Sequence, residues 1–306
     1  MRSQFFSSLV AALALSGCAT LLPTPEPVVE TPPPPSTQPT VVTPVAPKSV
    51  KIGLALGGGA ARGFAHIGVI KVLEAQGLAP DIIVGTSAGA VVGALYASGT
   101  NGFDLQKIAF KLEESKISDW SMPDRGVFKG EALQQFVNNA VAQRSIENLK
   151  KPFGVVATDL HSGEGILFRT GNTGMAVRAS ATVPGVFQPV NINGHEYVDG
   201  GLSSLVPVRS ARQMGANVVI AVDISARPDN RTVRGTLDIL LQTFTIMGQN
   251  LARFELKEAD VVIRPQVGSI GPTDFQARHD SILEGEKAAQ AALPQIREAI
   301  KKASGG

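Results

Sequence analysis

The sequence predicts an α/β layered fold whose central sheet is mostly parallel. Short runs rich in valine, isoleucine and leucine recur along the chain, and each has the length of a buried strand. The stretches between these runs have helical periodicity instead, and strands that alternate with helices are typical of a parallel sheet. The length of 306 residues is enough for one large α/β domain or two small ones.

The first 17 residues are typical of a signal peptide. Arg2 supplies the positive charge, and the apolar run at 5–15 is too short to span a bilayer. The run ends in LSGC at 15–18, which resembles the lipobox of bacterial lipoproteins. This resemblance implies that Cys18, the only cysteine, becomes the mature N-terminus and carries lipid. The alternative is an ordinary secretory signal in which the cysteine is incidental.

Residues 18–49 are expected to form the lipidated cysteine and a linker. Proline recurs throughout this stretch among threonine and valine, so it cannot build a core and should be an extended, polyproline-II-like tether. A proline motif that binds a partner domain is the alternative. The expected organisation is therefore a signal peptide at 1–17, the lipidated linker at 18–49 and one folded domain at 50–306.

The folded domain begins with a buried strand at 50–56, which a glycine-rich loop follows. Helical periodicity then extends over 61–76, and Gly77 stands where a helix ends. A second short strand at 81–84 precedes a helix of small residues at 87–97. The first half of the domain thus reads strand, helix, strand, helix.

The second half continues this alternation. Helical segments are predicted near 103–115 and 130–143, and an amphipathic helix at 281–302 contains Pro294, which should kink or split it. The remaining predicted elements are strands at 153–158, 165–169, 217–224 and 261–264 and a long helix at 233–258.

The pentapeptide GTSAG at 85–89 has the pattern G-x-S-x-G directly between a strand and a helix. A nucleophile elbow requires this context, because its serine must lie on a sharp turn at the end of the sheet. The N-terminus of the following helix would also stabilise developing negative charge. Ser87 is therefore the candidate nucleophile, and a glycine-flanked N-cap serine is the alternative.

The loop LGGGAARG at 56–63 is the second candidate site. Its three consecutive glycines, Gly57, Gly58 and Gly59, expose backbone N–H groups that could bind a phosphate or an oxyanion. A dinucleotide site fits poorly, since Arg62 stands where the third glycine of that fingerprint belongs. A Walker loop is excluded because no Gly-Lys-Ser/Thr follows. The oxyanion role fits better, because the next strand delivers a candidate nucleophile.

The base that activates the serine would ordinarily be a histidine. Of the four histidines, only His279 follows both Ser87 and Asp199, which is the order of an ordinary α/β-hydrolase triad, and its neighbours are polar. Asp199 lies at a strand end in YVDGG, and a partly desolvated carboxylate can itself accept the serine proton. Asp-Gly-Gly is also a common tight turn. Both bases remain open on these grounds.

Taken together, these motifs resemble the patatin-like phospholipase family. Its pattern is a GGGxxRG loop, a GxSxG elbow and a distant DGG or DGA, which stand here at 57–63, 85–89 and 199–201. The stretches GFAHIGV at 63–69 and RASATVPGVF at 178–187 are also similar to the family. Thr86 stands where plant patatins have aspartate, as is common in the bacterial, neuropathy-target-esterase-like branch.

The resemblance implies a three-layer α/β/α sandwich with a mostly parallel central sheet. It also implies a Ser–Asp dyad without histidine, with Ser87 as nucleophile and Asp199 as its base. The N–H groups of Gly57, Gly58 and Gly59 would form the oxyanion hole, and Arg62 would support it. The expected reaction is hydrolysis of carboxylic esters of phospholipids or lysophospholipids through an acyl-serine intermediate, without a metal or organic cofactor.

The composition sets expectations about partners. The formal net charge is +2 and the basic residues are scattered, so no nucleic-acid surface is expected. The expected partner is a membrane, as anchor and as source of substrate. By analogy with lipoprotein sorting, Ala19 favours the outer membrane of a Gram-negative-type bacterium, with the domain facing the periplasm or the surface. Two other functions stay open: a catalytically silent lipid-binding protein and a Ser–Asp–His esterase that uses His279.

Overall fold

The computed structural model describes residues 49–113, 128–227 and 235–305. The chain divides into two compact units, Met1–Val45 and Ala46–Gly306, and the described residues belong to the second. The signal peptide, Cys18 and the linker up to residue 48 lie outside these residues.

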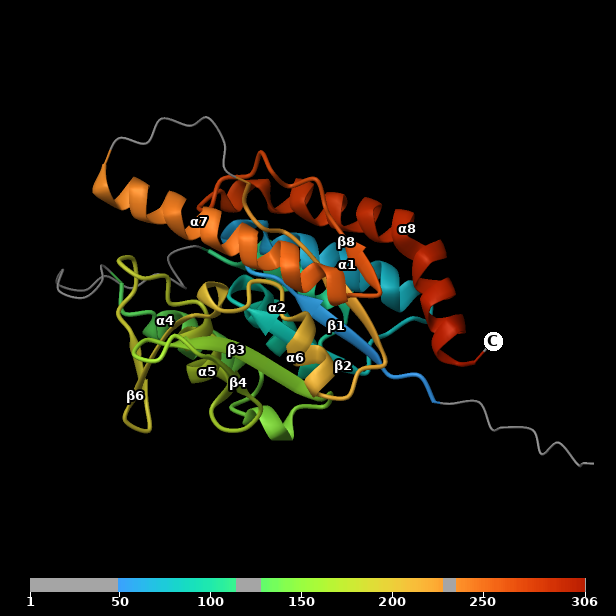
Figure 1. Ribbon diagram of the computed structural model, residues 1–306, viewed down its shortest axis with the longest axis horizontal. Helices are drawn as coiled ribbons and strands as arrows, with labels where there is room; N and C mark the ends of the chain where they lie inside the picture. Colours follow the sequence, from blue (N-terminus) through green and yellow to red (C-terminus); the bar gives the residue numbers. More distant parts are fainter. Residues whose placement is uncertain (1–48, 114–127, 228–234, 306) are drawn as a thin grey trace, which may run out of the picture. The chain divides into compact units, whose positions relative to one another are not determined.

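An eight-stranded sheet forms the centre of the domain (Figure 1). Its order is β5-β6-β3-β2-β1-β7-β8, with β4 paired to β3. The stretch from β3 to β8 is parallel throughout, whereas β4, β5 and β6 pair in antiparallel fashion, and the predicted mostly parallel sheet is thereby confirmed. The strands are β1 (Ile52–Leu56), β2 (Ile82–Thr86), β3 (Phe153–Asp159), β4 (Gly165–Phe168), β5 (Val190–Ile192), β6 (His195–Asp199), β7 (Val218–Val222) and β8 (Val261–Ile263).

Helices cover both faces of this sheet. Successive side chains of a strand point to opposite faces. Leu54 accordingly belongs to the core shared with α1, α2 and α8, while Ala55 packs on the other face with residues of α6 and the end of α7. These layers confirm the predicted α/β/α sandwich. The helices are α1 (Phe64–Ala75), α2 (Ala88–Ala97), α3 (Gly102–Lys111), α4 (Glu131–Ala140), α5 (Thr173–Ser180), α6 (Val208–Gln213), α7 (Thr236–Glu255) and α8 (Arg278–Ala303).

The backbones of α1 and α8 cross in direct contact. A Cβ atom added at Gly68 would lie 2.0 Å from the carbonyl oxygen of Ile282, and one added at Gly285 would lie 2.0 Å from that of Ala65. Only glycine fits at these two positions. The Ser281 hydroxyl also donates to the carbonyl oxygen of Arg62 at 3.2 Å, so α8 braces the turn that leads from the glycine loop into α1.

Two details differ from the sequence-based expectation. Pro294 does not split α8, which is one helix from Arg278 to Ala303. Pro294 and Gln290, whose carbonyl loses its helical partner, are both exposed, so water can hydrogen-bond the freed carbonyl. The helices α5 and α6 were not predicted, because eight and six residues are too few to show periodicity. None of the helices in the described ranges is both long and apolar enough to cross a bilayer.

Candidate active site

Ser87 lies on the turn between β2 and α2. Its φ is 53° and its ψ is −121°, a conformation that a residue with a Cβ atom rarely adopts. The glycines on either side make this turn possible. A Cβ at Gly85 would lie 2.4 Å from the carbonyl oxygen of Gly89, and a Cβ at Gly89 would lie 2.1 Å from that of Leu56. The strained strand–turn–helix geometry is that of a nucleophile elbow.

A buried serine on a neighbouring helix holds this elbow. The backbone N–H of Ser87 donates to Ser180 Oγ at 2.8 Å, and the Ser180 hydroxyl donates in turn to the carbonyl oxygen of Val156 on β3 at 2.5 Å. Ser180 is fully buried at the end of α5. In the sequence, Ser180 stands out only as part of a stretch that resembles the family, because nothing in the spacing from residue 87 to residue 180 indicates a contact.

We expect Ser180→Ala to lower the rate of ester hydrolysis about tenfold and the free energy of unfolding by about 1–3 kcal/mol, since the partly buried N–H of Ser87 is left without its acceptor. The loss should fall on kcat more than on KM, because the variant misplaces the nucleophile without altering the cavity wall. Steady-state kinetics and urea unfolding measure both effects. Ser98→Ala, which removes another buried serine hydroxyl that bonds only within its own neighbourhood, is the matched control. Equal kinetic losses in both variants would contradict a positioning role for Ser180.

Asp199 lies at the end of β6 and is 1% exposed. Its Oδ1 accepts the N–H of Gly201 at 2.7 Å, while Oδ2 has no hydrogen bond of regular geometry among the described residues. Burial raises the pKa of this carboxyl from 3.8 to about 6, against the lowering effects of the Gly201 N–H and the nearby Ser87 hydroxyl. Near neutral pH the carboxylate is ionised, poorly hydrated and next to a serine hydroxyl, which suits a general base.

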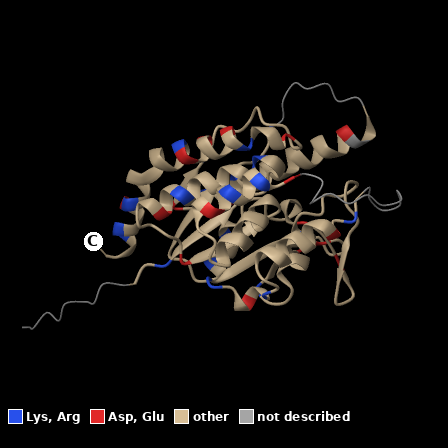
Figure 2. Cartoon of the chain, turned by 180° about the vertical axis from the view of Figure 1, so that it is seen from behind, with Lys and Arg blue, Asp and Glu red and all other residues tan. Residues whose placement is uncertain are grey.

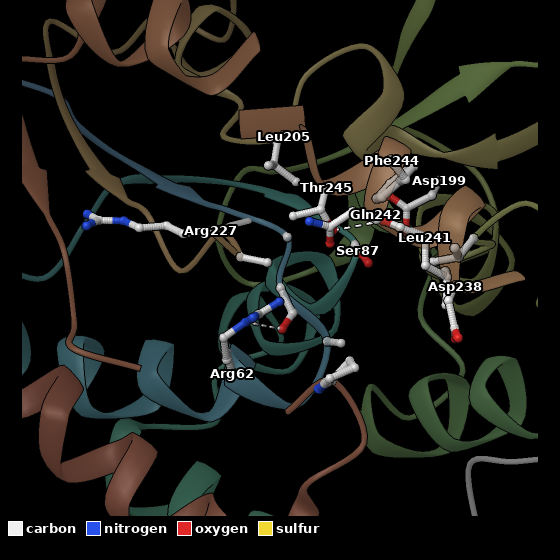
Figure 3. A pocket seen from close by; sticks show the side chains of 16 residues that line it. Arg62, Ser87, Asp199, Leu205, Arg227, Asp238, Leu241, Gln242, Phe244 and Thr245 are labelled. Carbon is white, nitrogen blue, oxygen red and sulfur yellow. Dashed lines mark hydrogen bonds between the residues drawn. The ribbon is translucent and has the colours of Figure 1, made fainter. Parts of the chain in front are cut away.

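Ser87 and Asp199 line one cavity of about 350 Å³ (Figure 3). The glycine loop forms one part of its wall, and the inner side of α7 forms another through Leu241, Phe244 and Thr245. The wall is mainly apolar. Its polar side chains are those of Ser87 and Asp199 and a few others, among them Arg62, Arg227 and Gln242. The cavity therefore offers an apolar surface next to the proposed nucleophile.

The glycine loop differs in part from its expected role. The N–H of Gly57 donates to the carbonyl oxygen of Val222 at 3.1 Å, and that of Gly58 donates to the carbonyl oxygen of Leu205 at 3.0 Å. In this structure, neither is available to an oxyanion. Within the described part of the chain, the N–H groups of Gly59 and Ala60 make no hydrogen bond, and both residues line the cavity. Of the three glycines expected to form the oxyanion hole, only Gly59 therefore keeps a free N–H group in this part of the structure. Ala60, which the glycine pattern could not indicate, is a second candidate donor.

Two buried side chains hold this loop in place. Arg62 Nε donates to the carbonyl oxygen of Gly59 at 3.1 Å. His66 Nε2 lies 2.8 Å from the carbonyl oxygen of Gly57. A carbonyl oxygen only accepts, so Nε2 carries the hydrogen. Burial lowers the pKa of His66 to about 4, although the Gly57 bond and the charge of Asp223 oppose the shift. His66 is therefore neutral, and its buried ring supports the glycine loop through the hydrogen bond to Gly57.

None of the four histidines lines the cavity. The ring of His279 stacks on Phe110 with 6.3 Å between centroids. His195 and His161 are exposed and lie beside carboxylates, with 3.1 Å from His195 Nδ1 to Asp159 Oδ2. Among the residues with described placement, no group of three or more His, Cys, Asp or Glu side chains is arranged to hold a metal ion.

An α/β/α sandwich that presents a serine on a strained elbow defines the class of nucleophile-elbow α/β proteins. The family model of the patatin-like phospholipases matches residues 54–212, just over half of the chain. This chain belongs to the patatin-like phospholipase family.

The sequences and folds of known proteins are similar to this chain. The human patatin-like phospholipase domain-containing protein 6 is 35% identical over 186 residues, which cover 58% of this chain and 14% of that protein. An uncharacterized NTE family protein of Mycobacterium tuberculosis is 36% identical over 180 residues, which cover 58% of this chain and 50% of that protein. The chain thus matches half or less of the length of these relatives. VipD from Legionella pneumophila shares the fold, with a TM-score of 0.55 and 15% identity over 82% of this chain and 68% of VipD.

Proposed function

We propose that this protein is a serine lipid acyl hydrolase that cleaves carboxylic esters of phospholipids or lysophospholipids with a Ser87–Asp199 dyad. One observation carries the proposal. A serine on a strained elbow and a buried carboxylate of raised pKa line the same largely apolar cavity, and no histidine does. The family and its relatives support lipid as the substrate class.

The dyad would work in two half-reactions. In the first, Asp199 accepts the hydroxyl proton as Ser87 Oγ attacks the ester carbonyl, and the N–H groups of Gly59 and Ala60 stabilise the oxyanion. The tetrahedral intermediate collapses, and the leaving alkoxide takes the proton from Asp199. In the second, Asp199 accepts a proton from water, which attacks the acyl-Ser87 ester. Collapse releases the fatty acid, and the proton returns from Asp199 to Ser87 Oγ.

Purified full-length protein should release fatty acid from a defined diacyl phospholipid, its lyso form, or both. Mass spectrometry of the products, with different acyl chains at the two positions, identifies the bond that is cut. His279→Ala should retain the full rate, since His279 lies outside the cavity wall. A His279→Ala variant without activity would favour the Ser–Asp–His alternative. Failure of Ser87 to react with a fluorophosphonate, together with no release of fatty acid, would favour a silent lipid-binding protein.

We also propose that the protein is a lipoprotein anchored through Cys18, on the basis of the LSGC sequence at 15–18 and the proline-rich stretch that follows. Several acyl chains hold a protein stably to a membrane, where one chain does not. Cells that express the protein and are fed labelled palmitate should label the wild-type chain, and Cys18→Ser should abolish that label and the processing before residue 18. Normal processing and labelling of Cys18→Ser would overturn the anchor.

A further inference from the structure

The outer side of α7 carries mostly large apolar residues, with the uncharged Thr243 and Asn250 between them, where a surface helix is ordinarily charged and polar. Helices that pack one side on a core carry charged and polar residues on the other. Between Asp238 and Arg253, α7 has no charged residue over nearly four turns. Its exposed positions recur every three to four residues, so they form one continuous face. The large apolar side chains on this face, each 43–63% exposed, are Ile239, Leu240, Ile246, Met247 and Phe254.

The opposite face of the molecule shows the usual pattern. Seen from the side of α1 and α8, charged residues are spread along the helices (Figure 2). The outer side of α8 carries ion pairs between Lys287 and Glu284 and between Lys302 and Glu298. Among the described residues, fewer large apolar side chains are exposed on that side, namely Phe103 and Phe110 on α3 and Leu283 on α8. The apolar face of α7 is therefore a local feature and not a property of the whole surface.

The inner side of the same helix belongs to the proposed active site. Leu241, Phe244 and Thr245 line the cavity that holds Ser87. Gly248 lets the helix approach the wall closely, since a Cβ added there would lie 3.1 Å from Leu205 Cδ2. The exposed apolar face and the cavity are thus separated by the thickness of one helix, about 10 Å.

Cationic side chains stand at the C-terminal end of the apolar face. Arg253 is exposed, and Lys257 Nζ lies 5.3 Å from the centroid of the Phe254 ring. Lysine and arginine that flank an apolar strip can lay their aliphatic stems on it and place their charges at the level of lipid phosphates. This arrangement complements an anionic lipid surface better than it complements another apolar helix.

We propose that the outer face of α7 is a membrane-docking surface that lies flat in the interface of a bilayer containing anionic phospholipid. This proposal rests on the proposed lipid hydrolase function and adds the route of its substrate. Docking places the cavity next to the acyl esters of the bilayer, so a phospholipid needs to move only a short distance to reach Ser87. The occupant is the lipid surface and not a second copy of the chain.

The test compares two double variants of the full-length protein, each made in a Cys18→Ser background so that the proposed lipid anchor does not hold either variant to the vesicles. Leu240→Gln/Phe254→Gln removes apolar surface from α7, and Phe103→Gln/Leu283→Gln makes the same chemical change at exposed positions on the opposite face. Each is assayed on mixed phosphatidylcholine and phosphatidylglycerol vesicles and on a dispersed short-chain ester. We expect the α7 variant to lose about tenfold or more on vesicles, because each buried side chain contributes to interfacial binding, and to keep the dispersed-ester rate within about twofold. The control should keep both rates.

Binding is measured separately from chemistry. In a full-length Ser87→Ala/Cys18→Ser background, co-sedimentation with the same vesicles should fall about tenfold on adding the α7 substitutions and stay unchanged on adding the control pair. Equal vesicle binding with and without the α7 substitutions would overturn the docking surface, even if hydrolysis were normal. An α7 variant that becomes monomeric from a dimer without losing vesicle binding would show a protein interface instead. If the wild type hydrolyses neither the vesicle phospholipid nor the dispersed ester, the proposed function is refuted. Co-sedimentation would still decide whether α7 docks on the membrane.

Discussion

Ser87→Ala is expected to lower ester hydrolysis by roughly 10⁴-fold or more, because the variant has no nucleophile to form the acyl-enzyme. The fold should tolerate the change. The Ser87 N–H bond to Ser180 Oγ belongs to the backbone and remains, and alanine keeps a Cβ atom at a φ of 53°, so the strain at the elbow is unchanged. Fatty-acid release and fluorophosphonate labelling measure the loss.

Ser304→Ala, at the C-terminal cap of α8, is the control for this experiment. It should retain both hydrolysis and labelling, since it removes a hydroxyl far from the elbow in the chain and outside the cavity wall. A Ser87→Ala protein that still turns over ester, or that still reacts covalently with the fluorophosphonate, would move the nucleophile to another residue.

Asp199→Asn is expected to lower hydrolysis by about 10²–10⁴-fold, the contribution of a positioned general base. Asparagine has the same shape and its carbonyl can still accept the Gly201 N–H, so the loss reflects basicity and not packing. In the wild type, the base must be ionised to accept the serine proton. Burial raises the pKa of Asp199 to about 6, so kcat/KM should rise as pH increases through about 6 and level off above it. The variant should lack this limb of the profile.

The same substitution should stabilise the fold near neutral pH. Because the pKa of Asp199 rises from 3.8 to about 6 on folding, the folded state between these two pH values holds a proton that the unfolded chain has already released. The contribution of Asp199 to stability is complete when the pH is below its pKa in the unfolded chain. That contribution is lost as the pH rises through its pKa in the folded state. At pH 7 the buried carboxylate therefore costs roughly 3 kcal/mol, which Asp199→Asn should recover in urea unfolding.

The pH dependence separates this explanation from a general packing effect. The gain in unfolding free energy should shrink when both proteins are unfolded near pH 4, since the wild-type carboxyl is then protonated in the folded state. Glu255, whose pKa burial raises to about 7, is present in both proteins and cancels in the comparison. An Asp199→Asn variant that is no more stable than the wild type at pH 7 would contradict the desolvated base.

Much of the fold was predictable from local pattern. Buried strands such as β1, β2 and β7 consist almost entirely of apolar and small residues, and glycine or polar residues bound them, so their existence and type follow from the residue pattern. The two short helices were not predictable. The helices α5 and α6 contain fewer than three turns each, and their helical state depends on packing against β3 and β1.

The candidate site divides in the same way. Ser87 between two small residues, three consecutive glycines and Asp199 before two more glycines are local patterns, and each marks a sharp turn or a close backbone approach that few residue types allow. Other contacts of the site join residues that are not sequence neighbours. The hydrogen bond between Ser87 and Ser180 joins residues 93 positions apart, and the one between His66 and Gly57 joins residues 9 positions apart. The occupied N–H groups of Gly57 and Gly58 likewise depend on strand β7 and on Leu205.

By itself, the sequence determined the class of fold, the family resemblance and the identity of the nucleophile and base candidates, because these rest on periodicity and on motifs whose residues are neighbours in the chain. Only the tertiary structure decided which groups meet. It brought Asp199 beside Ser87, left every histidine outside the cavity and turned one side of α7 toward the site with an apolar side toward solvent. The physical reason is that burial, desolvation and hydrogen bonding are set by neighbours in space, and helix crossings and strand order place residues together that are far apart in sequence.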